Sequence, residues 1–181
     1  ISNRPDAAGL ATALGADVAT TVIDHTLYES REAFDAALAE AVKQDNPDVV
    51  VLAGFMRILT PEFAARFSER LMNIHPSLLP LYPGLHTHQR ALDNGDSHAG
   101  ATVHYVTGEL DGGPPVLQAK VPVNSGDDAD ALAARVLAVE HQIYPVAINW
   151  HLCGRLTWED GSLKKDGMPV PPSGELWEST S

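Results

Sequence analysis

The segment from residue 72 to residue 88 constrains the fold more than any other stretch of this chain. Its prolines at positions 76, 80 and 83 lack a backbone donor and block a regular helix. The rest of the segment is largely apolar, so it belongs inside the protein, although neither a helix nor a continuous strand can run through it. We therefore predict a rigid loop that displays three polar side chains, Asn73, His75 and His88.

Helical and strand-like segments alternate in the first half of the chain. The predicted elements are helices over residues 7–14, 30–44 and from 61 onward, the last two capped by Ser30 and Thr60, and strands over residues 17–23, 49–55 and 71–74. The apolar run over residues 49–55 is typical of a parallel strand that is buried on both faces. This alternation predicts an α/β fold with an open, mostly parallel twisted sheet and helices on both faces. Ligands bind such sheets beyond the carboxyl ends of the strands.

The second half of the chain predicts an antiparallel element. Two strand-like segments, residues 101–107 and 116–123, are joined by a glycine-rich connection. A helix capped by Asp127 or Asp128 follows and runs to about residue 143, just before Pro145. Asp-Gly pairs at 160–161 and 166–167 predict a small hairpin. We expect one domain over residues 1–181, with a loose tail over residues 172–181.

Composition excludes several classes of function. The formal net charge of -12 leaves no basic stripe for a phosphate backbone, so the chain is not expected to bind nucleic acid. No apolar run is long enough to cross a bilayer, so no membrane partner is expected. The single cysteine, Cys153, rules out a disulfide within the chain and favours a reducing, cytoplasmic compartment.

Asn73, His75 and Asp111 form the group of residues best suited to chemistry. A carboxamide can donate to a developing oxyanion, and an imidazole can move protons near neutral pH. A carboxylate can orient that imidazole and stabilise its protonated form. Asn73 and His75 share a face if the segment is extended, and Asp111 lies in a glycine-rich loop. On spacing alone, a structural histidine and a turn aspartate are the more common outcome.

Three other groups of residues leave alternatives open. Five histidines could be metal ligands, but their spacing matches no zinc motif, and we expect no metal. Cys153 lacks a motif around it and is expected to be an inert, partly buried thiol. Three arginines could pair with a carboxylate on a ligand or simply face solvent. The histidines are His75, His86, His88, His98 and His104, and the arginines are Arg31, Arg57 and Arg90.

Three stretches together resemble the phosphoribosylglycinamide formyltransferase family, the folate-dependent transformylases of purine synthesis. They are residues 49–59 (Val-Val-Val-Leu-Ala-Gly-Phe-Met-Arg-Ile-Leu), residues 73–88, and residues 109–114 (Glu-Leu-Asp-Gly-Gly-Pro). The Asn-x-His and Ser-Leu-Leu-Pro motifs occur in a wider set of formyltransferases, whereas Pro-Gly-Leu-His-Thr-His is narrower. The resemblance runs in order from near residue 1 to about Trp150, and it implies a Rossmann-like formyltransferase fold.

The resemblance also implies roles for individual residues. Asn73, His75 and Asp111 match the catalytic trio of the family. The positions that match folate contacts are Arg31, Met56, Arg57, Ile58, Leu59, Asn73, Glu109, Leu110 and Asp111. Pro76 and Glu140 match positions at the ribonucleotide, and Thr102 and His104 match positions that line the active site.

The implied reaction is direct transfer of a formyl group from 10-formyltetrahydrofolate to the amine of glycinamide ribonucleotide. Asn73 and a protonated His75 would hold the oxyanion, while Asp111 would stabilise that imidazole and place a water that relays a proton. Two alternatives stay open: a hydrolase that passes the formyl group to water, and a folate-binding module without activity. The resemblance also leaves a homodimer open.

One motif of the family has no counterpart in this sequence. Members open with a strand and a Gly-Asn-Gly-Ser-Asn-like loop, whose backbone amides hold the substrate phosphate. This chain starts at Ile1-Ser2-Asn3, at what should be the second strand. We therefore expect that an N-terminal segment is missing, and that the chain as written binds folate better than the ribonucleotide.

Overall fold

The computed structural model describes residues 1–178 and divides into two compact units, Ile1–Pro47 and Asp48–Ser181. The expectation of a single domain stays a prediction. The first unit contains α1 (Ala8–Gly15), a short 3₁₀ helix η1 (His25–Leu27) and α2 (Arg31–Gln44). Ser30 begins α2 as predicted, because its side chain accepts a hydrogen bond from the N–H of Ala33.

The strand predicted over residues 17–23 is wrong. Within that stretch only Val22 forms a β-bridge, which is parallel to Ser2. A β-branched composition favours an extended backbone, but a strand also needs a neighbouring backbone that continues the ladder of hydrogen bonds. Here the pairing with Ser2 does not extend beyond a single bridge.

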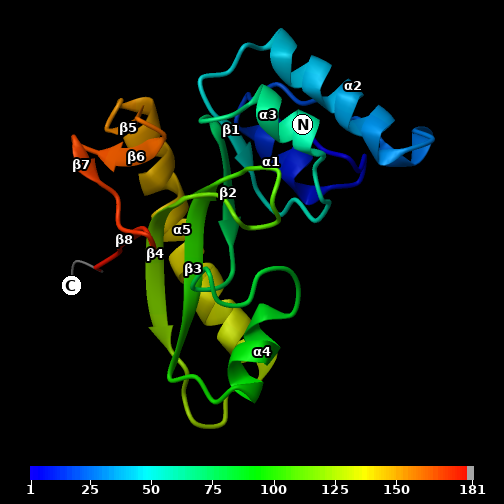
Figure 1. Cartoon of the computed structure of the whole chain (residues 1–181). Helices are drawn as coiled ribbons and strands as arrows, with labels where there is room; N and C mark the ends of the chain where they lie inside the picture. The colour runs from blue at the N-terminus through cyan, green and yellow to red at the C-terminus, as the bar shows by residue number, and fades with distance from the viewer. Residues whose placement is uncertain (179–181) are drawn as a thin grey trace. The chain divides into compact units, whose positions relative to one another are not determined.

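The second unit is built on a five-stranded sheet in the order β1-β2-β3-β4-β8 (Figure 1). The strands are β1 (Val50–Leu52), β2 (Leu71–His75), β3 (His98–Tyr105), β4 (Pro115–Pro122) and β8 (Glu175–Leu176). Strand pairs β1/β2 and β4/β8 are parallel, whereas β2/β3 and β3/β4 are antiparallel. The predicted α/β class, the open sheet and the antiparallel element are confirmed. Among the described strands, the sheet is more evenly mixed than the sequence predicted.

Strand β1 is shorter and more exposed than its sequence indicates. The apolar run over residues 49–55 predicted a strand buried on both faces, but Val51 is 37% exposed. Among residues 1–178, β1 pairs only with β2. The strand ends at Leu52, and Gly54 follows with a left-handed backbone (φ 61°) that turns the chain out of the extended conformation.

Three helices accompany this sheet: α3 (Pro61–Arg66), α4 (Thr87–Asp93) and α5 (Ala129–Leu152). Thr60 and Asp128 cap α3 and α5 as predicted, since their side chains accept hydrogen bonds from the N–H groups of Phe63 and Ala131. Helix α5 packs along β3 and β4, and α4 packs against α5 (Figure 1). These contacts bury the main hydrophobic core between α5 and the sheet.

Helix α5 continues past Pro145, although the sequence predicted that it ends near Ile143. A proline inside a helix removes one hydrogen bond and costs about 3 kcal/mol. Ile143, Tyr144 and Ala147 are buried on both sides of the proline, so packing against the sheet compensates for this cost. Pro145 itself is exposed.

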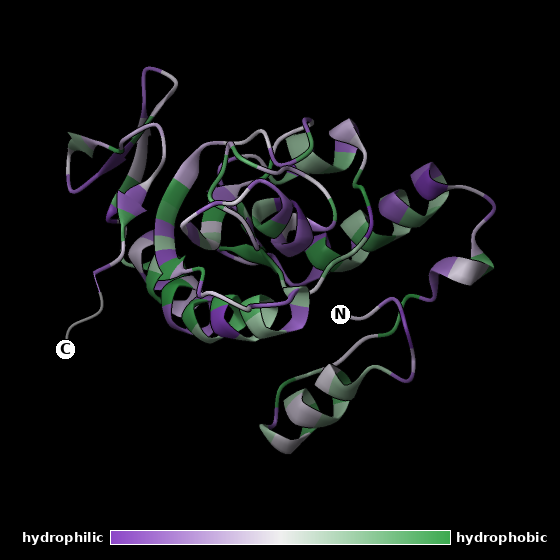
Figure 2. Ribbon diagram, turned by 90° about the horizontal axis from the view of Figure 1, so that it is seen from below, coloured by the Kyte–Doolittle hydropathy of each residue, from purple (hydrophilic) through white to green (hydrophobic). Residues whose placement is uncertain are grey.

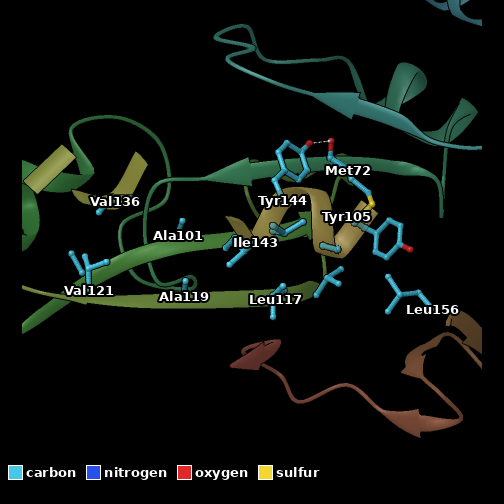
Figure 3. Packing of buried hydrophobic residues seen from close by; sticks show 14 of the residues in the cluster. Met72, Ala101, Tyr105, Leu117, Ala119, Val121, Val136, Ile143, Tyr144 and Leu156 are labelled. Carbon is cyan, nitrogen blue, oxygen red and sulfur yellow. Dashed lines mark hydrogen bonds between the residues drawn. The ribbon is translucent and has the colours of Figure 1, made fainter. Parts of the chain in front are cut away.

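Most of the core is formed by apolar side chains from β2, β3, β4 and α5 (Figure 3). Residues that are at most 1% exposed include Met72, Ala101, Val103, Val116, Leu117, Ala119, Leu132, Val136, Ile143 and Ala147. Tyr144 reaches from α5 to the sheet, where its hydroxyl lies 2.8 Å from the carbonyl oxygen of Leu52 and 2.9 Å from that of Met72. One phenol thus ties the helix to two adjacent strands, β1 and β2.

The C-terminal part is more ordered than predicted. Strands β5 (Leu156–Glu159), β6 (Ser162–Lys165) and β7 (Met168–Pro169) form a second, antiparallel sheet, which confirms the predicted hairpin. Both Asp-Gly pairs have positive φ at each residue, as such tight turns require. The loose tail predicted over residues 172–181 is wrong for Glu175–Leu176, which pairs with β4 as β8. Residues 179–181 lie outside the described part of the chain.

A buried polar network holds the proline-rich loop against the sheet. The Thr102 hydroxyl donates to the carbonyl of Ser77 (2.6 Å) and accepts from the N–H of Leu79 (3.0 Å). The Gln118 amide donates to the carbonyl of Leu79 (2.7 Å) and to the Thr102 hydroxyl (2.9 Å). The backbone groups of a loop that cannot form a ladder are therefore satisfied by side chains of β3 and β4.

No helix within residues 1–178 is both long and apolar enough to span a membrane. The helices carry hydrophobic and hydrophilic residues side by side when coloured by hydropathy (Figure 2). This pattern fits helices that pack one face against a core and leave the other in water.

We predict that Thr102→Val lowers the free energy of unfolding by about 1–3 kcal/mol, because the loop groups bonded to the hydroxyl lose their partner in the interior. Urea denaturation followed by circular dichroism measures the change. Thr157→Val is the matched control, since Thr157 is exposed on β5. Equal stability of the two variants would contradict the role assigned to the network.

Asp127 joins the end of β4 to the start of α5. Its carboxylate accepts two hydrogen bonds from Arg135 (2.7 and 2.9 Å) and one from the N–H of Asn124 (2.8 Å). These contacts, that with Arg135 foremost, lower the pKa of Asp127 to about 2. The ionised carboxylate therefore stabilises the fold above the ordinary aspartate pKa of about 4. This stabilisation is lost as the pH falls through about 2.

We accordingly expect Asp127→Asn to be less stable than the parent protein at pH 7, with a difference that shrinks as the pH is lowered from 4 towards 2. Thermal unfolding at several pH values measures it. The control is Asp160→Asn, in an exposed turn whose left-handed backbone asparagine also adopts. A stability difference that does not depend on pH would refute the ion pair as its source.

Candidate active site

The end of β2 and the facing part of β3 supply four neighbouring polar side chains. Asn73 lies opposite His104, and His75 lies opposite Thr102. Residues opposite each other on antiparallel strands project from the same face, and so do residues two apart on one strand. The prediction that Asn73 and His75 share a face is therefore confirmed by the register.

Asp111 comes from the glycine-rich connection between β3 and β4. Its Oδ2 accepts a hydrogen bond from the N–H of Gly84 (2.8 Å) and lies 3.4 Å from Nδ1 of His75. Its Oδ1 lies 3.8 Å from Nε2 of His104. Asp111 adopts a left-handed backbone (φ 51°), which aspartate tolerates better than most residues. The structure thus brings the three residues of the predicted trio together.

His75 is nearly buried, at 6% exposed, and both of its ring nitrogens have partners. Nε2 lies 2.9 Å from the carbonyl oxygen of Tyr82, so this nitrogen carries a hydrogen and donates it. Nδ1 faces the Asp111 carboxylate. A hydrogen on Nδ1 would therefore point at the Asp111 carboxylate.

His104 on β3 contacts the Asn73 side chain and is only 2% exposed. Its Nε2 lies 3.2 Å from Nδ2 of Asn73, and its Nδ1 lies 2.9 Å from the carbonyl oxygen of Tyr105. Burial lowers the pKa of His104, an effect that the Tyr105 carbonyl and Asp111 partly oppose. This lowered pKa favours the neutral imidazole.

The backbone at Tyr105 is crowded by the loop that carries Asp111. A Cβ added to Gly113 would lie 1.8 Å from the carbonyl oxygen of Tyr105, far inside any contact distance. The N–H of Tyr105 in turn donates to the carbonyl of Pro114 (3.1 Å). Only glycine allows the loop to approach β3 this closely, and the approach brings Asp111 over His75 and His104.

An open pocket of about 510 Å³ lies beside these side chains, counting the part that opens to solvent. Asn73, His104 and Asp111 are among the residues that line it, whereas His75 lies behind Asp111. The remaining lining residues are Leu52, Phe55, Arg57, Ile58, Leu59, Val106, Thr107, Gly108, Glu109 and Leu110. The pocket therefore presents a carboxamide and a carboxylate at one end of a partly apolar cleft.

Most residues that the resemblance assigned to the folate lie at this pocket. Arg57, Ile58, Leu59, Glu109 and Leu110 line it, as do Asn73 and Asp111. Met56 is 78% exposed and lies outside the lining. Arg31 belongs to α2 in the first unit, Ile1–Pro47, so its role stays a prediction.

The two residues assigned to the ribonucleotide lie elsewhere in the second unit. Pro76 lines a smaller pocket of about 240 Å³ together with Tyr82, His88 and Asp96. Glu140 is half-buried on α5, and burial raises the pKa of its carboxyl. Their binding roles stay predictions.

The other groups considered from the sequence are placed as follows. Within residues 1–178, no three or more histidines, cysteines, aspartates and glutamates gather closely enough to hold a metal ion. The expectation that the reaction uses no metal stays a prediction. Cys153 is exposed rather than partly buried, and its thiol lies 3.6 Å from the amide oxygen of Asn149. Arg90 lies over the ring of Tyr82 and donates to the carbonyl of Pro83 (2.7 Å), so it braces the loop.

Reasoning from the sequence did not identify the backbone groups at this site. The carbonyls of Tyr82 and Tyr105 and the N–H of Gly84 each hold a side chain of the cluster. Every residue carries the same carbonyl, so no residue type signals such a contact. The partnership of His104 with Asn73 depends on the strand register, which the sequence did not reveal either.

Comparisons with known proteins agree with this geometry. The family model described as formyl transferase matches residues 1–148. The phosphoribosylglycinamide formyltransferase of Escherichia coli (strain K12) is 53% identical over 173 residues, which cover 96% of this chain and 82% of that protein. The trifunctional purine biosynthetic protein adenosine-3 of Bos taurus is 45% identical over 148 residues, which cover 82% of this chain and 15% of that protein.

Solved structures show the same likeness. The phosphoribosylglycinamide formyltransferase of Coxiella burnetii, solved in complex with CHES, superposes with a TM-score of 0.91 at 43% identity. That match covers 97% of this chain and 83% of the other. With a matched family model, close relatives and a shared fold, the chain belongs to the formyl transferase family, among the phosphoribosylglycinamide formyltransferases.

Proposed function

We propose that this protein transfers a formyl group from 10-formyltetrahydrofolate to the amine of glycinamide ribonucleotide. The observation that carries the proposal is a pocket lined by Asn73 and Asp111, with His75 in contact with that Asp111 carboxylate, in a chain 53% identical to the Escherichia coli transferase. The amine nitrogen attacks the formyl carbon and forms a tetrahedral oxyanion. The bond between that carbon and N10 of the folate then breaks, and its electron pair returns to N10.

Asn73 is the residue best placed to hold the oxyanion. It lines the pocket, and one hydrogen of its amide is directed to His104. The second amide hydrogen stays available for the negative oxygen. A preorganised donor in a site that excludes water stabilises such charge far more than it would in bulk water.

Asp111, with His75 beside it, is placed to transfer the proton that the amine loses. Asp111 lines the pocket and can accept this proton, directly or through a water, and pass it to N10. His75 lies against the same carboxylate, and an imidazolium formed during the reaction would balance the carboxylate's charge. Direct contact between His75 and the oxyanion requires that Nε2 exchange the Tyr82 carbonyl for the substrate.

The residues around the pocket suggest how the two substrates are held. Arg57 to Leu59 and Glu109 to Leu110 both line the cleft and are proposed to contact the folate. Arg31 and Met56 are proposed as further folate contacts, and Pro76 and Glu140 as contacts to the ribonucleotide. A cytoplasmic location and a homodimer also stay predictions.

The proposal is tested by mixing the purified protein with 10-formyltetrahydrofolate in the presence and absence of glycinamide ribonucleotide. We expect formylated ribonucleotide and deformylated folate in equal amounts, and little formate. Formate release that does not depend on the ribonucleotide would favour a hydrolase. Folate binding without turnover would favour a binding module, and either result would overturn the proposal.

We expect Asn73→Ala to lower kcat by about 10²–10³, the usual effect of removing one oxyanion donor. The KM for either substrate should change much less, because this interaction strengthens mainly in the transition state. Steady-state kinetics and a melting curve measure both effects. Asn149→Ala, at an exposed position on α5, is the matched control and should keep the parent kcat. A near-normal kcat for Asn73→Ala would contradict the assignment.

A further inference from the structure

The tautomer of His104 follows from its contacts. Nδ1 lies 2.9 Å from the carbonyl oxygen of Tyr105, and a carbonyl can only accept a hydrogen bond. Nδ1 therefore carries the hydrogen. In the neutral imidazole the other nitrogen, Nε2, is then a bare acceptor. Burial of His104, which is 2% exposed, favours this neutral form.

The tautomer of His104 determines which way the Asn73 amide faces. Nε2 of His104 lies 3.2 Å from Nδ2 of Asn73, so the bare nitrogen receives one amide hydrogen. If the amide were turned by 180°, its oxygen would face the lone pair of Nε2 and the two acceptors would repel each other. The contact therefore selects one of two amide orientations that have nearly the same shape.

We propose that His104 is a positioning residue that holds the Asn73 amide with its NH₂ group available to the reacting oxygen. The inference rests on the proposed function, because it assumes that Asn73 acts as the oxyanion donor. A reversed amide would place its carbonyl oxygen where the NH₂ group now lies, and both amide hydrogens would move away from the reacting oxygen. The carbonyl of Tyr105, the imidazole of His104 and the amide of Asn73 thus form one directed chain of hydrogen bonds.

The loop that carries Asp111 supports this series of hydrogen bonds. Oδ1 of Asp111 lies 3.8 Å from Nε2 of His104, beyond an ordinary hydrogen bond, so Asn73 remains the closer partner of that nitrogen. Gly113 packs against the Tyr105 carbonyl that receives the hydrogen of Nδ1. The same loop therefore brings the carboxylate into the site and encloses the group that sets the tautomer.

A double-mutant cycle tests the proposal through kinetics. His104→Phe keeps an aromatic ring but removes both ring nitrogens, the Nε2 acceptor among them, and we expect kcat to fall by about 10- to 100-fold, bounded by the loss in Asn73→Ala. The KM for each substrate should stay within about threefold. In the Asn73→Ala background the same change should lower kcat further by less than about threefold, since the residue that His104 positions is already absent.

Two further variants separate positioning from general damage. His104→Gln retains a side-chain oxygen that can accept from Asn73, and it should recover part of the kcat lost in His104→Phe. His98→Phe makes the same substitution at an exposed position of β3 and should keep the parent kcat. Additive losses in the cycle, or a parent-like kcat in His104→Phe, would overturn the proposal.

If His104→Phe does not fold, the proposal can still be tested by a measurement on the parent protein that does not depend on activity. Nitrogen-15 NMR of the imidazole side chains of the parent protein identifies which nitrogen of His104 carries hydrogen. We expect the hydrogen on Nδ1, with Nε2 unprotonated at neutral pH. The opposite tautomer, or a doubly protonated ring, would overturn the proposal even in an active enzyme. Absence of formyl transfer would instead refute the proposed function and leave the tautomer result standing.

Discussion

The polar site of this protein depends on the register in which β2 and β3 pair. The register sets Asn73 opposite His104 and His75 opposite Thr102, all on one face. A shift of one residue would turn each of these side chains to the other face of the sheet. Thr102 then fastens the proline-rich loop, and His104 orients the Asn73 amide. One strand pairing therefore sets both the support of the site and its chemistry.

Backbone groups of the proline-rich loop hold two of the site's side chains in place. The loop that follows β2 returns the carbonyl of Tyr82 to His75 and the N–H of Gly84 to Asp111. Its own polar groups are satisfied by Thr102 and Gln118, so the loop stays in place without a ladder or a helix. Prolines stiffen such a segment by restricting its dihedral angles. The loop is both a brace for the site and a part of it.

Local signals predicted local structure well. Ser30, Thr60 and Asp128 begin helices because each side chain satisfies an N–H group of the first turn. The Asp-Gly turns form because aspartate and glycine tolerate positive φ. Three predictions that depended on distant partners were wrong. Residues 17–23 lack a continuing ladder, α5 runs through Pro145 because both flanks are buried, and β8 forms because β4 offers an edge.

Short stretches of the chain were enough to predict the α/β class, the capped helices and the residue types of the site, since these depend on periodicity, caps and motifs. The likeness to the formyltransferases also lies in such stretches. The folded structure was needed to show that Asp111 lies against His75, that His104 contacts Asn73, and that three backbone groups hold them. These contacts join segments up to 36 residues apart, as between His75 and Asp111. Strand register and loop closure set such contacts, and neither leaves a local pattern in the chain.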